Sequence, residues 1–170
     1  MPSIRREGHI RLMNVHDLEL VLGWRNHPDI RTAMTTQHEI SLDEHQEWFE
    51  KSRTNTHRTL LIYERHEALG YANLEESYPG IFAWGFYAAP DAPKGTGRAL
   101  CREVLGYAFE QKVAHKVSGQ VLAGNEKSIR LHQALGFRSE GTLREHCLIG
   151  STYHDLICFG LLKAEWAAGN

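Results

Sequence analysis

A short glycine-containing segment near the middle of the chain has the residue types that bind phosphate groups. The segment Lys94-Gly95-Thr96-Gly97-Arg98 follows a strand-like run and leads directly into a long amphipathic pattern. Glycine lets the backbone approach an anion closely, and the free N–H groups of a helix N-terminus add partial positive charge. Lys94 and Arg98 supply formal charge beside them. Together these residues predict a binding site for a pyrophosphate.

Gly-x-Gly also occurs in ordinary tight turns between a strand and a helix, so its surroundings decide the interpretation. A Rossmann dinucleotide site has a third glycine and an early position in a β-α-β unit. A nucleotide P-loop has the pattern GxxxxGK[ST]. The sequence around Gly95 and Gly97 matches neither pattern. The segment therefore indicates a phosphate site of another kind.

A second segment, residues 125–137, combines a helix start with a titratable side chain. Asn125 is a good N-cap residue, and Ser128, Leu131 and His132 share one face of the helix that follows. Packing against a sheet explains the leucine well but the histidine poorly. Because histidine can deliver a proton near neutral pH, His132 is a candidate general acid.

Taken together, the two segments resemble motifs A and B of the GNAT superfamily of N-acetyltransferases. Residues 92–97 match R/Q-x-x-G-x-G/A except at Ala92, and residues 125–137 match N-x-x-[AS]-x-x-[LF]-[YH]-x-x-x-G-F. The resemblance extends over nearly the whole chain and implies a single GNAT domain at residues 1–170. It also implies that an amine attacks the thioester of acetyl-CoA directly, without a covalent enzyme intermediate and without a metal.

The resemblance implies roles for particular residues. His132 stands where the family often has a tyrosine that acts as general acid beside the thioester sulfur. Asn73 and Gln120 stand where relatives place polar groups that hold a water near the amine, and the identity of the general base stays open. The pantetheine arm is expected to pair with backbone between two splayed strands. The expected contacts with the cofactor are Phe86, Tyr87, Ala88, Lys94, Gly95, Thr96, Gly97, Arg98, Asn125 and Ser128.

Hydrophobic periodicity and turn residues predict the elements that position these side chains. Strands are expected at residues 9–12, 59–63, 69–74, 81–88, 117–122, 137–143 and 153–162. Helical patterns cover residues 17–25, 30–34, 41–49, 97–111 and 125–135. This order predicts a mixed α/β fold with a three-strand meander at its centre. The GNAT resemblance implies a mostly antiparallel sheet of about six or seven strands flanked by four helices, with splayed fourth and fifth strands.

The N-terminal half carries the residues expected to choose the acceptor. The segments Trp24-Arg25-Asn26-His27-Pro28 and Glu44-His45 resemble the N-acetyltransferases that act on UDP-4-amino-4,6-dideoxy-N-acetyl-altrosamine in the pseudaminic acid pathway, which serves flagellin glycosylation. This resemblance implies a UDP-linked amino sugar as acceptor, bound by Arg25, Asn26 and His45. Arg25 and His45 can donate charge-assisted hydrogen bonds to a pyrophosphate. The alternative is that Trp24 is a core residue and that Arg25 pairs with an acid such as Glu44.

Composition excludes several other classes of protein. The length of 170 residues suits one domain, and the formal net charge of −2 argues against nucleic-acid binding. Three widely spaced cysteines without CxxC, and histidines without a ligand spacing, argue against a disulfide framework or a zinc site. No apolar run approaches the ~20 residues of a membrane span. The charged first residues show no secretory signal, so a cytoplasmic protein is expected.

Three rival functions and two further questions stay open. A ribosomal-protein N-terminal acetyltransferase would need an open groove for a peptide, and a polyamine acetyltransferase an acidic one. Arg25, His27 and Arg31 disfavour a polycation. A non-catalytic acyl-CoA-binding module is favoured by Ala92 and opposed by His132. The sequence does not define the oligomeric state, with a homodimer as one option, or the stereochemistry of the sugar.

Overall fold

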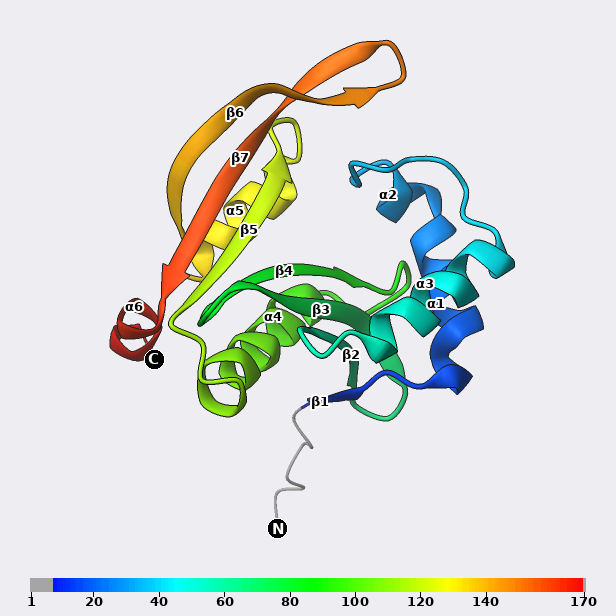
Figure 1. Ribbon diagram of the computed structural model, residues 1–170, viewed down its shortest axis with the longest axis horizontal. Helices are drawn as coiled ribbons and strands as arrows, with labels where there is room; N and C mark the ends of the chain where they lie inside the picture. Colours follow the sequence, from blue (N-terminus) through cyan, green and yellow to red (C-terminus); the bar gives the residue numbers. More distant parts are fainter. Residues whose placement is uncertain (1–7, 170) are drawn as a thin grey trace.

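The computed structural model describes residues 8–169. A seven-stranded sheet runs through the molecule in the order β1-β2-β3-β4-β5-β7-β6 (Figure 1), and all neighbouring strands are antiparallel except β4 and β5. The strands are β1 (His9–Leu12), β2 (Arg58–Glu64), β3 (Ala68–Tyr78), β4 (Ile81–Ala88), β5 (Lys116–Leu122), β6 (Arg138–Ile149) and β7 (Thr152–Leu162). The α-helices are α1 (Leu18–Asn26), α2 (Pro28–Arg31), α3 (Leu42–Thr54), α4 (Thr96–Gly106), α5 (Glu126–Ala134) and α6 (Lys163–Ala168).

These elements confirm the predicted fold class, with three differences from the sequence-based expectation. The four expected flanking helices are present as α1, α3, α4 and α5, and the described residues contain two further short helices, α2 and α6. Helix α6 follows β7 without a break and spans six residues, too few to show a helical period. The helix expected over residues 97–111 ends at Gly106 and continues as a π-helical turn at Tyr107–Gln111. Strand β6 runs on to Ile149 through polar residues with no alternating pattern.

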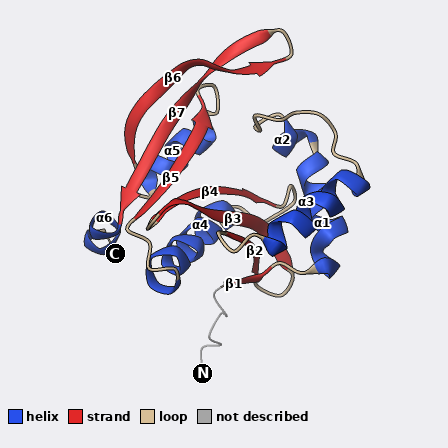
Figure 2. Ribbon diagram, viewed as in Figure 1, coloured by secondary structure: helices blue, strands red, loops and turns tan. Residues whose placement is uncertain are grey.

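The two faces of the sheet are covered by different helices. Helices α4 and α5 pack on one face over a core that includes Leu74, Trp84 and Val117. Helices α1 and α3 cover the other face, where Ile62 and Tyr71 belong to a second buried cluster. Figure 2 shows α1, α2 and α3 grouped together, away from α5 and α6. In the described part of the chain, every helix is too short or too polar to cross a bilayer.

Strands β4 and β5 separate after a short paired stretch. Their parallel register runs only from Ile81–Lys116 to Ala83–Ser118. Beyond that point β5 pairs with β7 and turns away from β4 (Figure 1). This confirms the predicted splay and leaves one edge of each strand open along its remaining residues.

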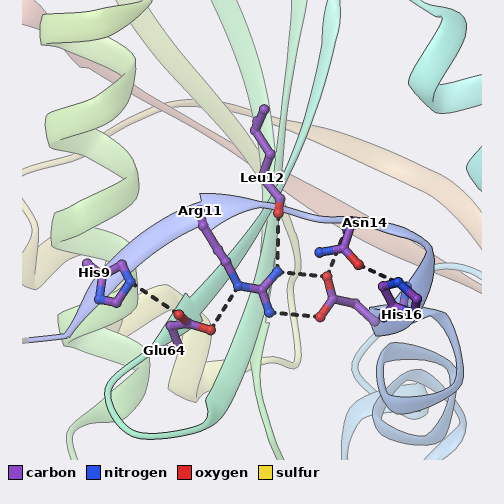
Figure 3. A network of polar contacts seen from close by, with 7 residues as sticks. His9, Arg11, Leu12, Asn14, His16 and Glu64 are labelled. Atoms are coloured by element: carbon purple, nitrogen blue, oxygen red, sulfur yellow. Dashed lines mark hydrogen bonds and ion pairs between the residues drawn. The ribbon is translucent and has the colours of Figure 1, made fainter.

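A polar network joins β1 to β2 and to the turn before α1 (Figure 3). Two guanidinium nitrogens of Arg11 donate to the carboxylate of Asp17 at 2.8 Å each, and Arg11 Nε donates to Glu64 at 2.8 Å. Burial alone would raise the pKa of Asp17, but hydrogen bonds from Arg11 and the Asn14 backbone lower it overall. The network thereby fixes β1 and the turn before α1, and with them the helices on that face.

Candidate active site

The glycine-containing segment forms the N-terminal end of α4, as the sequence predicts. Gly95 is the N-cap residue with φ of 91°, a left-handed conformation that glycine adopts without strain. Thr96 is 2% exposed, and its hydroxyl donates to the carbonyl of Pro93 at 2.7 Å. The Thr96 N–H donates to the same carbonyl at 3.1 Å. The next amides, of Gly97 and Arg98, belong to the first turn of α4 and have no partner within the helix.

The surroundings of the turn leave room for a ligand. A Cβ built on Gly95 or Gly97 would have no neighbouring heavy atom within 4 Å. The side chains of Lys94 and Arg98 are exposed beside it. Free amides, open space and two cations fit the pyrophosphate that the sequence predicts. Ala92 is half-buried and packs against both hydrophobic cores, so it holds the loop by apolar contact.

The open edge of β4 lies next to this turn. Phe86, Tyr87 and Ala88 pair with β3 on one side and lie beyond the last β4–β5 pair on the other. An extended ligand can therefore add its polar groups to this edge in place of a strand. The geometry fits the expected pantetheine arm.

His132, the candidate general acid, is buried in a cluster of aromatic rings. Its side chain is 2% exposed and stacks on Phe159, with ring centroids 5.0 Å apart. Its Nδ1 lies 2.8 Å from the carbonyl of Ser128 and therefore donates. Its Nε2 accepts from the indole N–H of Trp84 at 3.2 Å. Burial lowers the pKa of His132, although the bond to Ser128 partly opposes this.

These bonds conflict with the general-acid prediction. The Nδ1 proton is directed to the helix carbonyl of Ser128, and Nε2 accepts a hydrogen bond instead of carrying a proton. A lowered pKa keeps the ring neutral at pH 7. In this arrangement His132 has no proton free to give to a leaving thiolate. Asn125 and Ser128 keep their predicted place at the start of α5, where the Asn125 side chain accepts from the Ser128 N–H at 3.2 Å.

The two residues expected to hold a water lie on the sheet face opposite α4. Asn73 pairs with Gly85 across β3 and β4, and a Cβ at position 85 would lie 2.6 Å from Asn73 Oδ1. The missing side chain of Gly85 therefore makes room for the Asn73 amide. Gln120 is exposed on β5, beyond the point where β4 and β5 separate.

The acceptor side contains two buried nitrogens without a hydrogen-bond partner. Arg25 Nη2 donates to the carbonyl of Thr36 at 2.7 Å, but Arg25 Nη1 is buried and unpartnered. His45 is 4% exposed and its Nε2 is also buried without a partner. Glu44 bonds to His38 instead of pairing with Arg25, and Trp24 is buried in the core as expected. Unpartnered buried polar groups are costly, so these two atoms mark a place where a ligand can bind.

Burial lowers the pKa of both Arg25 and His45, with different consequences for their charge. It lowers the pKa of His45, and a backbone hydrogen bond with Leu18 opposes this only partly. It also lowers the pKa of Arg25, which stays a cation because arginine titrates far above neutrality. An anion that reaches Arg25 therefore meets a fixed positive charge, whereas the neutral imidazole of His45 presents Nε2 as a hydrogen-bond acceptor.

Asn26 holds the segment between α2 and α3 in place. Its Nδ2 donates to the carbonyl of Ile40 and its Oδ1 accepts from the Ile40 N–H, both at 2.8 Å. The amide keeps a second N–H and a second lone pair, and the role of Asn26 in binding substrate stays a prediction.

A pocket of about 330 Å³ lies between the α2 region, the end of β5 and the β6–β7 hairpin. Figure 1 shows α2 and the hairpin on opposite sides of this region. The lining is of mixed polarity and contains no aspartate, glutamate, lysine or arginine. It consists of Thr32, Ala33, Gln37, Leu122, Gly124, Asn125, Ile149 and His154.

Sequence reasoning missed two residues that shape the site, Trp84 and Gly119, and one interaction of Tyr87, which it expected only as a contact of the cofactor. Trp84 was treated only as part of a strand, yet it bonds His132. Gly119 was not singled out, although its missing side chain gives Trp84 and His132 room. The side chain of Tyr87 lies between Tyr71 and the acceptor face, where it interacts electrostatically with Arg25. An aromatic strand residue opposite a glycine is a signal that could have identified the first pair.

A parallel strand pair that splays beside a glycine turn and an anion-binding helix end defines an acetyltransferase of the GNAT type. The model of the acetyltransferase (GNAT) domain family matches residues 9–138, and the chain belongs to this family.

Several known proteins are similar to the chain. Acetyltransferase PseH of Campylobacter jejuni is 30% identical over 122 residues, which cover 71% of this chain and 76% of that protein. The structure of ribosomal-protein-alanine N-acetyltransferase from Brucella melitensis is 28% identical, with a TM-score of 0.77 over 90% of this chain and 98% of that one. Spermidine N-acetyltransferase from Vibrio cholerae, solved with CoA and spermine, is 24% identical, with a TM-score of 0.87 over 95% of this chain and 98% of that one. At that identity, the last similarity shows the fold alone.

Proposed function

We propose that this acetyltransferase moves the acetyl group of acetyl-CoA to the 4-amino group of a UDP-linked amino sugar, as in the pseudaminic acid pathway that serves flagellin glycosylation. The observation that carries the proposal is the pair of buried, unpartnered nitrogens on the acceptor face, Arg25 Nη1 and His45 Nε2. The similarity to acetyltransferase PseH supports the same acceptor. The cytoplasm, which supplies acetyl-CoA, is the expected location.

The donor side would be formed mainly by backbone. The amides at the start of α4, with Lys94 and Arg98, would hold the pyrophosphate. The open edge of β4 at Phe86 to Ala88 would hold the pantetheine arm. When bound, acetyl-CoA would supply a thioester whose carbonyl carbon an amine can attack.

The acceptor side would be formed by side chains. Arg25 would donate from its free Nη1 to the diphosphate of the nucleotide sugar, and His45 Nε2, which is an acceptor in the neutral ring, would accept from a hydroxyl group of the nucleotide sugar. Asn73 and Gln120 would hold the water that receives the proton of the amine. A sugar amine is less basic than lysine, so weak assistance from such a water is sufficient.

The charges of the acceptor side favour the sugar over a polyamine. The pocket between α2 and the hairpin contains no aspartate or glutamate among its lining residues, whereas a polycation needs carboxylates. Arg25 adds a buried positive charge to the same face. A ribosomal-protein terminus is the remaining rival, because the Brucella structure is similar over nearly its full length.

The proposal is tested by thiol release from acetyl-CoA with three acceptors: a UDP-4-amino sugar, spermidine and a ribosomal-protein N-terminal peptide. We expect turnover with the UDP-4-amino sugar and a product heavier by one acetyl group in mass spectrometry. Turnover of spermidine or of the peptide with no reaction of the sugar would overturn the proposed acceptor. Turnover of none, in a protein that binds CoA, would favour a non-catalytic acyl-CoA-binding module.

A further inference from the structure

The point at which β4 and β5 separate coincides with an unusual side-chain arrangement. The last parallel pair is Ala83–Ser118, so Trp84 and Gly119 are the next residues on the two strands. Tryptophan has the largest side chain of all residue types, and glycine has none. Both lie on the sheet face that α5 covers, and Figure 1 shows α5 beside β5 where it leaves β4.

Glycine is the only residue type that fits at position 119, between the two strands and α5. A Cβ at position 119 would lie 2.7 Å from Trp84 Nε1 and 2.9 Å from His132 Nε2. Real Cβ atoms are not found at such distances, so a ring would have to move. Neither ring is free to do so, because Trp84 and His132 are bonded to each other and packed against Phe137.

The bond between Trp84 and His132 links three elements. The indole N–H comes from β4, its acceptor comes from α5, and both atoms lie over β5 at Gly119. On its other side, His132 is fixed to its own helix through Ser128. The two rings therefore pack together beneath α5, over the first unpaired position, where they contact β4, β5 and α5 at once.

We propose that Trp84, Gly119 and His132 form a wedge that sets the separation of β4 and β5 and so the width of the pantetheine slot. In this role His132 is a positioning residue that fixes the indole, and it transfers no proton. The inference rests on the proposed use of acetyl-CoA, because the slot is the one assigned to the pantetheine arm. The wedge should affect binding of the pantetheine arm and leave binding of the pyrophosphate unchanged, because the pyrophosphate site lies elsewhere, at the N-terminus of α4.

The test compares two ligands by calorimetry: CoA, and 3′-phospho-ADP, which is CoA without its pantetheine arm. Gly119→Ala should weaken CoA binding by about 10- to 100-fold, the size of effect that a displacement of about 1 Å has on positioned groups. Binding of 3′-phospho-ADP should not change. Gly106→Ala is the matched control, because a Cβ there meets nothing within 4 Å. This control should bind both ligands as the wild type does.

A second substitution tests whether the indole is responsible. Trp84→Phe in the Gly119→Ala background removes the Nε1 atom that the new Cβ contacts, so it should restore part of the lost CoA affinity. If Gly119→Ala does not fold, Trp84→Phe alone should weaken CoA binding and leave 3′-phospho-ADP unaffected. A folded Gly119→Ala with wild-type CoA affinity, or with equal losses for both ligands, would overturn the wedge. A wild-type protein that binds neither ligand would remove the proposed function, and this inference with it.

Discussion

The donor and acceptor sides of this molecule use different parts of the chain. The donor side depends on backbone, namely the left-handed Gly95, the amides that open α4 and the free edge of β4. In the proposed function the acceptor side would depend on side chains, namely those of Arg25 on α1 and His45 on α3, which carry the buried, unpartnered nitrogens. Backbone recognition needs little beyond a turn and a glycine, whereas side-chain recognition depends on packing.

This difference explains why relatives with the same fold can use different acceptors. A backbone cradle is expected to tolerate changes at neighbouring residues, such as Ala92 where the family pattern has Arg or Gln. The acceptor site, in contrast, changes with a single substitution in one of the helices on the opposite face, α1 or α3. Use of the acetyl-CoA donor is therefore expected to be common to the family, while the choice of acceptor varies with the side chains on the other side of the sheet.

The largest expected effect comes from placing a negative charge in the backbone cradle. Gly97→Asp should weaken acetyl-CoA binding by at least about 100-fold, because hydrogen bonds to charged groups contribute up to about 3 kcal/mol. The Cβ at this position meets nothing within 4 Å, so the fold should survive. Calorimetry with acetyl-CoA and a circular dichroism spectrum measure the two outcomes.

Gly23→Asp is the control for charge alone, since its Cβ also meets nothing within 4 Å and it lies on α1. It should bind acetyl-CoA normally. Unchanged acetyl-CoA affinity in a folded Gly97→Asp protein would contradict the assignment of the cradle.

The next largest effect concerns the side-chain site. Arg25→Ala should raise the acceptor KM by about tenfold to about a hundredfold, corresponding to the 1.5–3 kcal/mol of a hydrogen bond to a charged group. The KM for acetyl-CoA should not move, because Arg25 lies on the other face of the sheet. Steady-state kinetics with each substrate varied in turn measures both values.

Arg25→Lys separates charge from geometry. Lysine keeps the positive charge but lacks the forked guanidinium that bonds Thr36 and a ligand together, so the acceptor KM should still rise. If Arg25→Ala only lowers the melting temperature and leaves the acceptor kinetics unchanged, Arg25 is a structural residue.

Local sequence signals predicted the donor side well. The limits of β4 follow from the apolar run before Pro90, and the start of α5 follows from Asn125 as N-cap. Tertiary contacts explain what was missed. The burial of His132 depends on Phe159, and the hydrogen bonds of the Asn26 amide depend on Ile40, and neither contact has a local sequence pattern. The short α6 has too few residues to show a period.

A smaller effect is expected for the residues that would hold the water. Gln120→Ala should lower kcat by about twofold to tenfold, because a single neutral hydrogen bond contributes about 0.5–1.5 kcal/mol. Gln120 is exposed, so stability should not change. Single-turnover kinetics measures the effect on the chemical step. A loss of several hundredfold would mean that Gln120 contacts the reacting groups directly.

A change in pH is expected to have the smallest effect on activity among these predictions. It should have a clear effect on the free energy of unfolding. Burial lowers the pKa of both His45 and His132, so the unfolded chain binds more protons near its ordinary pKa of about 6.5. Their contribution to stability is complete above that pH and is lost as the pH falls below it. The free energy of unfolding in urea should therefore decrease between about pH 7.5 and about pH 5.5.

The double variant His45→Gln/His132→Gln should show a weaker dependence on pH in the same titration. An identical slope in this variant and in the wild type would mean that other groups cause the acid sensitivity.

Calorimetry with UDP tests the acceptor assignment most directly, because UDP carries the diphosphate and no reactive amine. We expect UDP to bind the wild-type protein, to bind Arg25→Ala at least about tenfold more weakly, and to bind Gly97→Asp as it binds the wild type. Spermidine should show no binding under the same conditions. Binding of spermidine without binding of UDP, or equal UDP affinity in the wild type and Arg25→Ala, would contradict a nucleotide-sugar acceptor held by Arg25.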